Sequence, residues 1–267
     1  MLLREVGYAR PRSLAEAIEL LAADDGARAL AGGQTMINVM KARAGSPDAL
    51  VDLNGLDELR RIELGADGTL ELGAMATYSA IIASSEARAR PILGEVCAQI
   101  ADVQVRNRGT IGGNVCTNDP TNHLPPLLAA LGAQFTIAGR DGERTVGADE
   151  FFLGVYLTAV AQGEVLTKIT VPAGRNDGFA AVTLGVDGTC IVSAAASLNG
   201  SVRVALGCVD AVPVVLTPAS DGADAVRAAV HEAGLEPPSD VHASAKYRRH
   251  LAGVLAVRAV DQARSAA

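Results

Sequence analysis

The sequence predicts an α+β protein built in two parts. Over the first 173 residues, strand signals and helix signals alternate along the chain. Past residues 173–178 the pattern changes, because strand signals follow one another and helix signals come after them. Strands followed by helices are typical of a separate α+β unit. We therefore predict one domain over residues 1–174 and a second over residues 175–267.

The composition supports a folded core and restricts the classes of function. Hydrophobic residues make up 49% of the 267 residues, which is enough for a substantial core. The net charge of −7 disfavours nucleic-acid binding, which needs basic residues. No export signal or membrane span is evident, so we expect a cytoplasmic protein. The four cysteines lack metal-ligand spacing, and we expect reduced thiols and no bound metal.

Local patterns predict the elements of the first part in order. Ser13 is the expected N-cap of the first helix, and Glu16 completes a capping box. Short apolar runs at 27–31 and 49–53 predict strands, the first of them buried. Turn residues and apolar spacing predict the rest: hairpins around Gly68 and Gly142, helices that start at Thr77 and Pro91, and a strand ended by Pro172.

The second part begins with antiparallel strands. The runs 179–185, 190–198 and 202–209 predict three strands, and Asn199-Gly200 is a strong hairpin signal between the last two. Two helices are predicted after them, over 223–233 and 244–263. This part is therefore expected to be a small antiparallel sheet with helices.

Two glycine-paired segments, residues 29–43 and 106–120, carry the main functional signal. Each joins an apolar stretch to two glycines and then to a small polar residue. Glycine lacks a Cβ atom, so such a segment can bring backbone N–H groups close to a phosphate. Thr35 is expected to cap a helix after the first pair. Either segment alone could be a plain tight turn, but two of them suggest a ligand with two phosphates held from both sides.

Other catalytic signatures are missing from the sequence. It contains neither the dinucleotide fingerprint G-x-G-x-x-G nor the Walker motif, and no nucleophile elbow or zinc-protease motif. No histidine or carboxylate sits in a recognisable acid/base pair. We therefore expect no catalytic side chain, which suits a protein whose cofactor carries the chemistry.

Both segments resemble a known family. The run RALAGGQT resembles the pyrophosphate loop of the FAD-binding medium subunit of molybdenum hydroxylases, the carbon monoxide dehydrogenase and xanthine dehydrogenase class. The run QVRNRGTIGGNVCTNDPTNHLPPLL is similar to the family's second FAD loop. Residues 151–172 and 243–260 resemble its flavin-side stretch and its C-terminal helix. The resemblance implies a two-part FAD-binding domain of the vanillyl-alcohol-oxidase-like (PCMH) type, subdivided near residues 55–60, before the small C-terminal domain.

The resemblance also implies a set of FAD contacts. The first segment would bind the FAD pyrophosphate through its backbone, and the second would form the loop on the opposite side of the pyrophosphate. Leu166 would lie against the isoalloxazine ring. Arg28 would lie near the adenosine part. From the residues alone, Arg28 is better read as a solvated surface charge, and Leu166 is equally compatible with a plain core leucine in a strand. The implied residues are Arg28, Ala31, Gly32, Gly33, Gln34, Thr35, Met36, Thr110, Gly112, Gly113, Asn114, Thr117 and Leu166.

Two positions depart from the family pattern. His123 stands where many relatives have an aspartate after the proline turn, and we interpret it as a surface loop residue. Near Ala181 the chain lacks the lysine of an aromatic-x-Lys pattern. These departures leave open whether the chain binds FAD as its relatives do.

The implied function is electron transfer within a larger enzyme. By resemblance, a large partner subunit holds the molybdenum cofactor, and a small one holds two-iron two-sulfur clusters that pass electrons to FAD in this chain. The FAD would then pass the electrons to an external acceptor. The assembly is expected to be a dimer of heterotrimers. The alternatives are a self-sufficient flavin oxidoreductase of the same fold and a scaffold subunit without flavin.

Overall fold

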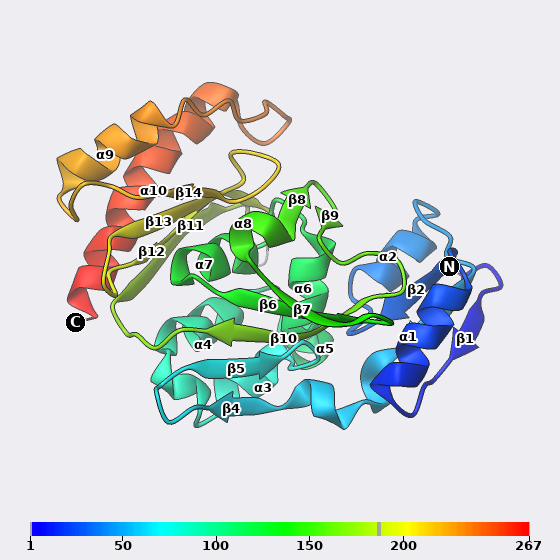
Figure 1. Ribbon diagram of the computed structural model, residues 1–267. Helices are drawn as coiled ribbons and strands as arrows, with labels where there is room; N and C mark the ends of the chain where they lie inside the picture. Colours follow the sequence, from blue (N-terminus) through cyan, green and yellow to red (C-terminus); the bar gives the residue numbers. More distant parts are fainter. Residues whose placement is uncertain (1, 186–187, 267) are drawn as a thin grey trace.

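The computed structural model describes residues 2–185 and 188–266, and its fold is α+β (Figure 1). The chain begins with a small parallel sheet of order β1-β3-β2, which lies at the opposite end of the molecule from the C-terminal helix (Figure 1). Its elements are β1 (Gly7–Ala9), α1 (Leu14–Ala23), β2 (Ala27–Leu30), α2 (Met36–Lys41) and β3 (Ala49–Asp52).

The start of α1 confirms Ser13 as its N-cap, since the Ser13 side chain accepts a hydrogen bond from the Glu16 N–H. The carboxylate of Glu16 accepts from the backbone N–H of Arg12. The expectation that β2 is buried is wrong. Arg28 and Ala29 are exposed, since β2 is an edge strand of its sheet and both residues line a cavity.

A five-stranded antiparallel sheet of order β4-β5-β10-β6-β7 forms the middle of the molecule. Its strands are β4 (Ile62–Leu64), β5 (Leu70–Gly73), β6 (Gln134–Gly139), β7 (Gly142–Gly147) and β10 (Val165–Val171). Both expected hairpins are present, and Gly68 and Gly142 have the positive φ values of 83° and 111° that their turns require.

We call this sheet and the helices within residues 62–171 the middle unit. Most of these helices lie between β5 and β6 in the chain. They are α3 (Tyr78–Ala83), α4 (Pro91–Ala98), α5 (Val103–Arg108), α6 (Ile111–Thr117) and α7 (Leu124–Leu131). Short 3-10 helices cover Leu53–Gly55, Asp57–Arg60 and Ala87–Ala89, and α8 (Ala148–Phe151) leads into the small hairpin β8 (Phe152–Gly154) and β9 (Leu157–Thr158). Thr77 caps α3 and Pro91 opens α4, as the sequence predicts.

The chain ends with a four-stranded antiparallel sheet and two helices. The strands are β11 (Asp177–Thr183), β12 (Cys190–Ser197), β13 (Arg203–Gly207) and β14 (Val214–Leu216), and the helices are α9 (Ala223–Glu232) and α10 (Ala245–Ser265). Helix α10 covers one face of this sheet and α7 contacts the other face (Figure 1). Buried residues of α7 and both large sheets share one core cluster, so the two sheets pack against a common layer of helices.

Within the described parts of the chain, no helix is both long and apolar enough to cross a bilayer.

Candidate functional site

A cavity of about 650 Å³ lies where the parallel sheet meets the middle unit. Its walls come from β2, the start of α2, α6 and β10, elements that are far apart in the sequence. The structure brings every residue of the predicted site to this one cavity: Arg28, Ala31, Gly32, Gly33, Gln34, Thr35, Met36, Thr110, Gly112, Gly113, Asn114, Thr117 and Leu166.

The first glycine segment forms the turn between β2 and α2. Gly33 has a φ of 74°, which a residue with a side chain adopts only with strain. Gly32 has no room for a side chain, because an added Cβ would lie 2.2 Å from the carbonyl oxygen of Arg108. Within the described residues, the N–H groups of Gly33, Gln34 and Thr35 have no hydrogen-bond acceptor. The turn therefore offers unpaired backbone donors to a ligand.

Thr35 is the N-cap residue of α2, as the sequence predicts, but its side chain does not cap the helix. Thr35 has helical φ and ψ values of −89° and −53°, and its hydroxyl makes no capping bond. An N-cap side chain reaches the helix N–H groups from an extended backbone, which Thr35 does not have. The capping donors at this end of α2 are consequently left for another acceptor.

The second glycine segment begins a helix instead of forming an open loop. Thr110 is the N-cap of α6, and its hydroxyl accepts from the Gly113 N–H at 3.0 Å. The Gly112 N–H donates to the carbonyl of Ala74 at 2.8 Å. The sequence-based expectation of free N–H groups in this segment is therefore wrong for both glycines, because the helix cap and the neighbouring chain use them.

The small size of these glycines is still needed. A Cβ on Gly112 would lie 2.5 Å from the carbonyl oxygen of Ala74, which is far inside contact distance. A Cβ on Gly113 would lie 2.9 Å from the Thr110 hydroxyl oxygen, and it would reach ordinary contact, at 3.5 Å, with the Ala31 Cβ of the first segment. The two segments therefore face each other closely enough to hold a ligand between them.

Asn114 brings an unused acceptor to the cavity. Its Nδ2 donates to the Tyr78 hydroxyl at 3.0 Å, while its buried Oδ1 has no partner among the described residues. Burial raises the pKa of Tyr78, which keeps the phenol neutral. A buried amide oxygen without a donor is costly, so a ligand hydroxyl or N–H would fit here.

The remaining predicted residues differ in what they can offer. Leu166 is only 4% exposed in β10 and presents an apolar wall. The Thr117 hydroxyl donates to the Gly113 carbonyl at 2.7 Å inside α6. The Arg28 guanidinium donates to the Ala27 carbonyl and to Gln162, so it is tied to the rim of the cavity rather than fully solvated.

His123 is not a surface loop residue, so that interpretation is wrong. It is 8% exposed and directly precedes α7, and its ring lies 5.2 Å from that of Phe179. Its Nδ1 is buried without a partner in the described residues. The four-stranded sheet covers this position, and nothing in the local sequence marks that long-range contact.

Two further cavity residues were not named from the sequence, although the resemblance placed their stretch, residues 151–172, beside the flavin. Tyr156 and Leu157 come from the β8–β9 hairpin, which overhangs one side of the cavity. Asn118 fixes this hairpin, since its Nδ2 donates to the Gly154 carbonyl at 2.7 Å and its own carbonyl accepts from the Tyr156 N–H. These contacts join positions more than thirty residues apart, so no local pattern could have indicated them.

Comparison with known proteins identifies the family of the chain. Residues 4–174 match the family described as the FAD binding domain in molybdopterin dehydrogenase. The chain is 37% identical to the carbon monoxide dehydrogenase medium chain of Afipia carboxidovorans, over 97% of both proteins. It is 33% identical to the glyceraldehyde dehydrogenase medium chain of Sulfolobus acidocaldarius, over 97% of this chain and 98% of that one.

A solved structure extends the likeness to the whole fold. A chain of quinoline 2-oxidoreductase from Pseudomonas putida 86 superposes with a TM-score of 0.92 at 34% identity, covering 100% of this chain and 99% of that one. The similarity thus includes the glycine segments, both large sheets and the C-terminal helices. The chain belongs to the family of FAD-binding medium subunits of molybdopterin dehydrogenases and is an FAD-dependent oxidoreductase subunit.

Proposed function

We propose that this chain is the electron-transfer subunit of a heteromeric molybdenum hydroxylase, in which it takes electrons from iron–sulfur clusters of a partner and passes them to an external acceptor. The observation that carries the proposal is the pair of glycine segments that face each other across one cavity. A bound FAD would supply the redox chemistry. The chain would supply binding and orientation.

The residues present fit FAD. The free N–H groups of Gly33, Gln34 and Thr35 suit the pyrophosphate, since backbone donors bind phosphate oxygens without a positive side chain. The unpaired Asn114 Oδ1 suits a donor on the cofactor, and Leu166 suits the apolar face of the flavin ring. We propose these residues, with the others predicted above, as the FAD contacts.

The assembly follows from the same proposal. The relatives are medium chains of dehydrogenases, which supports a large molybdenum-binding partner and a small iron–sulfur partner. Within the described residues, no group of three or more His, Cys, Asp or Glu side chains is placed to hold a metal ion. We further propose a cytoplasmic dimer of heterotrimers, with the flavin domain over residues 1–174, subdivided near 55–60, and the second domain over 175–267.

Adding FAD to the purified chain tests the cofactor role. The bound flavin should give absorption bands at about 370 and 450 nm that remain after gel filtration. Gly113→Ala should weaken FAD affinity by about tenfold or more, because the new methyl group would lie 2.9 Å from the Thr110 hydroxyl that caps α6 and would enter the gap toward Ala31 of the first segment.

Gly253→Ala is the matched control, since a Cβ there has no neighbour within 4 Å and the residue lies in α10, away from the cavity. It should bind FAD as the original chain does. A chain that retains no flavin would refute the proposed function and favour a flavin-free scaffold. Turnover of a small substrate by the isolated chain would instead favour a self-sufficient flavoenzyme.

A further inference from the structure

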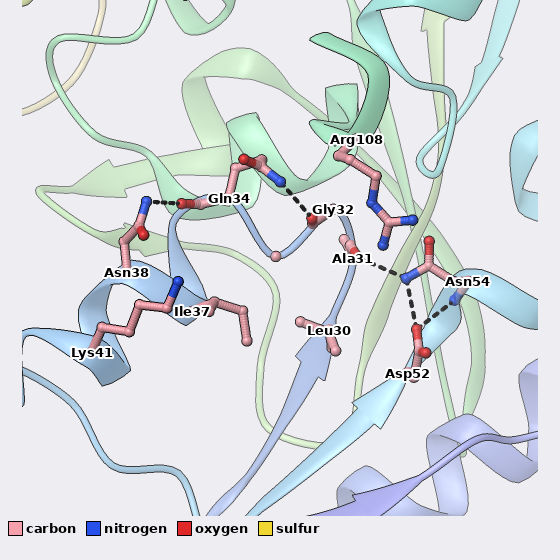
Figure 2. Close-up of a pocket in the computed structure, with 11 residues that line it drawn as sticks. Leu30, Ala31, Gly32, Gln34, Ile37, Asn38, Lys41, Asp52, Asn54 and Arg108 are labelled. Carbon is pink, nitrogen blue, oxygen red and sulfur yellow. Dashed lines mark hydrogen bonds between the residues drawn. The ribbon is translucent and has the colours of Figure 1, made fainter. Parts of the chain in front are cut away.

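The side chain of Asn54 holds the carbonyl group of Ala31, in the first glycine segment, by a hydrogen bond. The Asn54 Nδ2 donates to the Ala31 oxygen at 2.8 Å and also to the Asp52 Oδ1 at 2.7 Å (Figure 2). Asn54 follows β3, whose parallel neighbour β2 leads into the segment. A side chain at the end of one strand thus fixes the main chain at the end of the next.

Asn54 is itself held in one orientation. The Asp52 Oδ1 accepts from the Asn54 N–H at 2.9 Å, and the Asp52 Oδ2 accepts from the Tyr8 hydroxyl at 2.6 Å. Arg60 donates to the Asn54 Oδ1 at 3.1 Å, so the amide oxygen also has a partner. With its oxygen occupied by Arg60, the amide can only present its NH₂ group to Ala31.

The hydrogen bond from Asn54 to the Ala31 carbonyl controls the direction of the Gly32 N–H. A peptide group is planar and trans, so the Ala31 C=O and the Gly32 N–H point in opposite directions. Asn54 and Asp52 line a smaller cavity of about 290 Å³ and do not line the larger one, whereas Ala31 and Gly32 line both. The Gly32 N–H is therefore directed away from Asn54, and it has no acceptor among the described residues.

We propose that Asn54, oriented by Asp52, is a positioning residue for FAD binding, because it fixes the peptide plane that aims the Gly32 N–H at the pyrophosphate. The proposal rests on the proposed function. It assigns Asn54 and Asp52 a role in cofactor affinity although neither side chain lines the larger cavity.

The test compares three ligands on the full chain. Asn54→Ala should weaken binding of FAD by about five- to tenfold, the loss expected for one hydrogen bond. ADP, which carries the pyrophosphate without the flavin ring, should lose a similar factor in competition with FAD. Riboflavin, which has the ring without the pyrophosphate, should show unchanged affinity, a split that general loss of structure would not produce.

Asn199→Ala is the matched control. Asn199 also links distant groups through its amide, donating to Asp177 and Ser197, but it lies on the C-terminal sheet. This variant should bind FAD normally. Equal weakening of FAD and riboflavin by Asn54→Ala, an unchanged FAD affinity, or the same loss in Asn199→Ala would each overturn the inference. Failure of the original chain to bind FAD would refute the proposed function instead.

Discussion

Gly32 and Gly112 show how single residues set the distance between the two halves of the site. At both positions a Cβ would collide with a backbone carbonyl oxygen, at 2.2 Å from Arg108 and 2.5 Å from Ala74. Gly33 is needed for another reason, its positive φ of 74°. The neighbouring glycines of one pair thus serve different purposes, one for packing and one for backbone conformation.

Asn118 combines a strained backbone with a buried side chain. Its φ is 42°, in the left-handed region, and its Nδ2 holds the Gly154 carbonyl of the hairpin that overhangs the cavity. We expect Asn118→Ala to lower the free energy of unfolding by about 2 kcal/mol, because it loses the hydrogen bond and adds left-handed strain. Urea denaturation measures this change.

The glycine variant at this position separates the two causes. Asn118→Gly removes the same amide but accepts the left-handed conformation, so it should be about 1 kcal/mol less destabilised than Asn118→Ala. If both variants lose the same stability, the backbone conformation contributes nothing.

At the scale of elements, the ion pair between Arg90 and Asp177 joins the middle unit to the C-terminal sheet. The guanidinium precedes α4, the carboxylate begins β11, and both side chains are at most 2% exposed. Their two contacts are 2.6 and 2.8 Å long, and Arg90 also reaches the Pro172 carbonyl and Ser197. The sequence predicts the helix that follows Arg90, but it places Asp177 in the linker before the strand predicted over 179–185, and it gives no sign that the two residues pair.

Arg90→Met should lower the free energy of unfolding by about 3–5 kcal/mol, because it leaves the Asp177 charge buried without its partner. Urea denaturation followed by circular dichroism measures the loss. Arg140→Met is the control, since it removes an exposed pair with Glu19 and should cost far less stability. Comparable losses in the two variants would show that burial of the first pair has no energetic consequence.

Elements specified by nearby residues could be predicted from the sequence, whereas long-range contacts could not. The Ser13 cap, the Gly68 and Gly142 turns and the strand ended by Pro172 depend on neighbours within a few positions, and each is confirmed. The interpretation of His123 was wrong because its surroundings come from a distant part of the chain, and the Thr35 side chain does not cap α2 because its own backbone is helical. Strand β14 was missed, since three residues are too few for a clear alternating pattern.

At the scale of the whole molecule, the candidate site joins units that are separate in the sequence. The α+β fold was predicted from the order of strand and helix signals and the family from the glycine segments and two further matched runs, and both predictions are confirmed. The predicted site residues do line one cavity, but their contacts with FAD stay a prediction. The supporting network of Asp52 and Asn54 had no sequence signal, because it depends on the pairing of two parallel strands.

A ligand that bridges these units should stabilise the whole chain. Binding to the folded state alone contributes about 2.7 kcal/mol when the free FAD concentration is one hundred times its Kd. We therefore expect the unfolding temperature of the purified chain to rise with FAD concentration, as measured by differential scanning calorimetry. Gly113→Ala should show a smaller rise at equal FAD concentration. An unfolding temperature independent of FAD would contradict binding across the units.

The contact of Gly32 with the Arg108 carbonyl also bears on how such chains can diverge. Main chain rather than side chain fills that contact, so no other amino acid can replace glycine there without moving a backbone. Gln34, two positions later, reaches only the Gly32 carbonyl of its own turn and is under no such restriction. Relatives should therefore differ freely at positions such as Gln34 while they keep the glycine at position 32. This glycine would still identify the family when most other residues of the segment have been substituted.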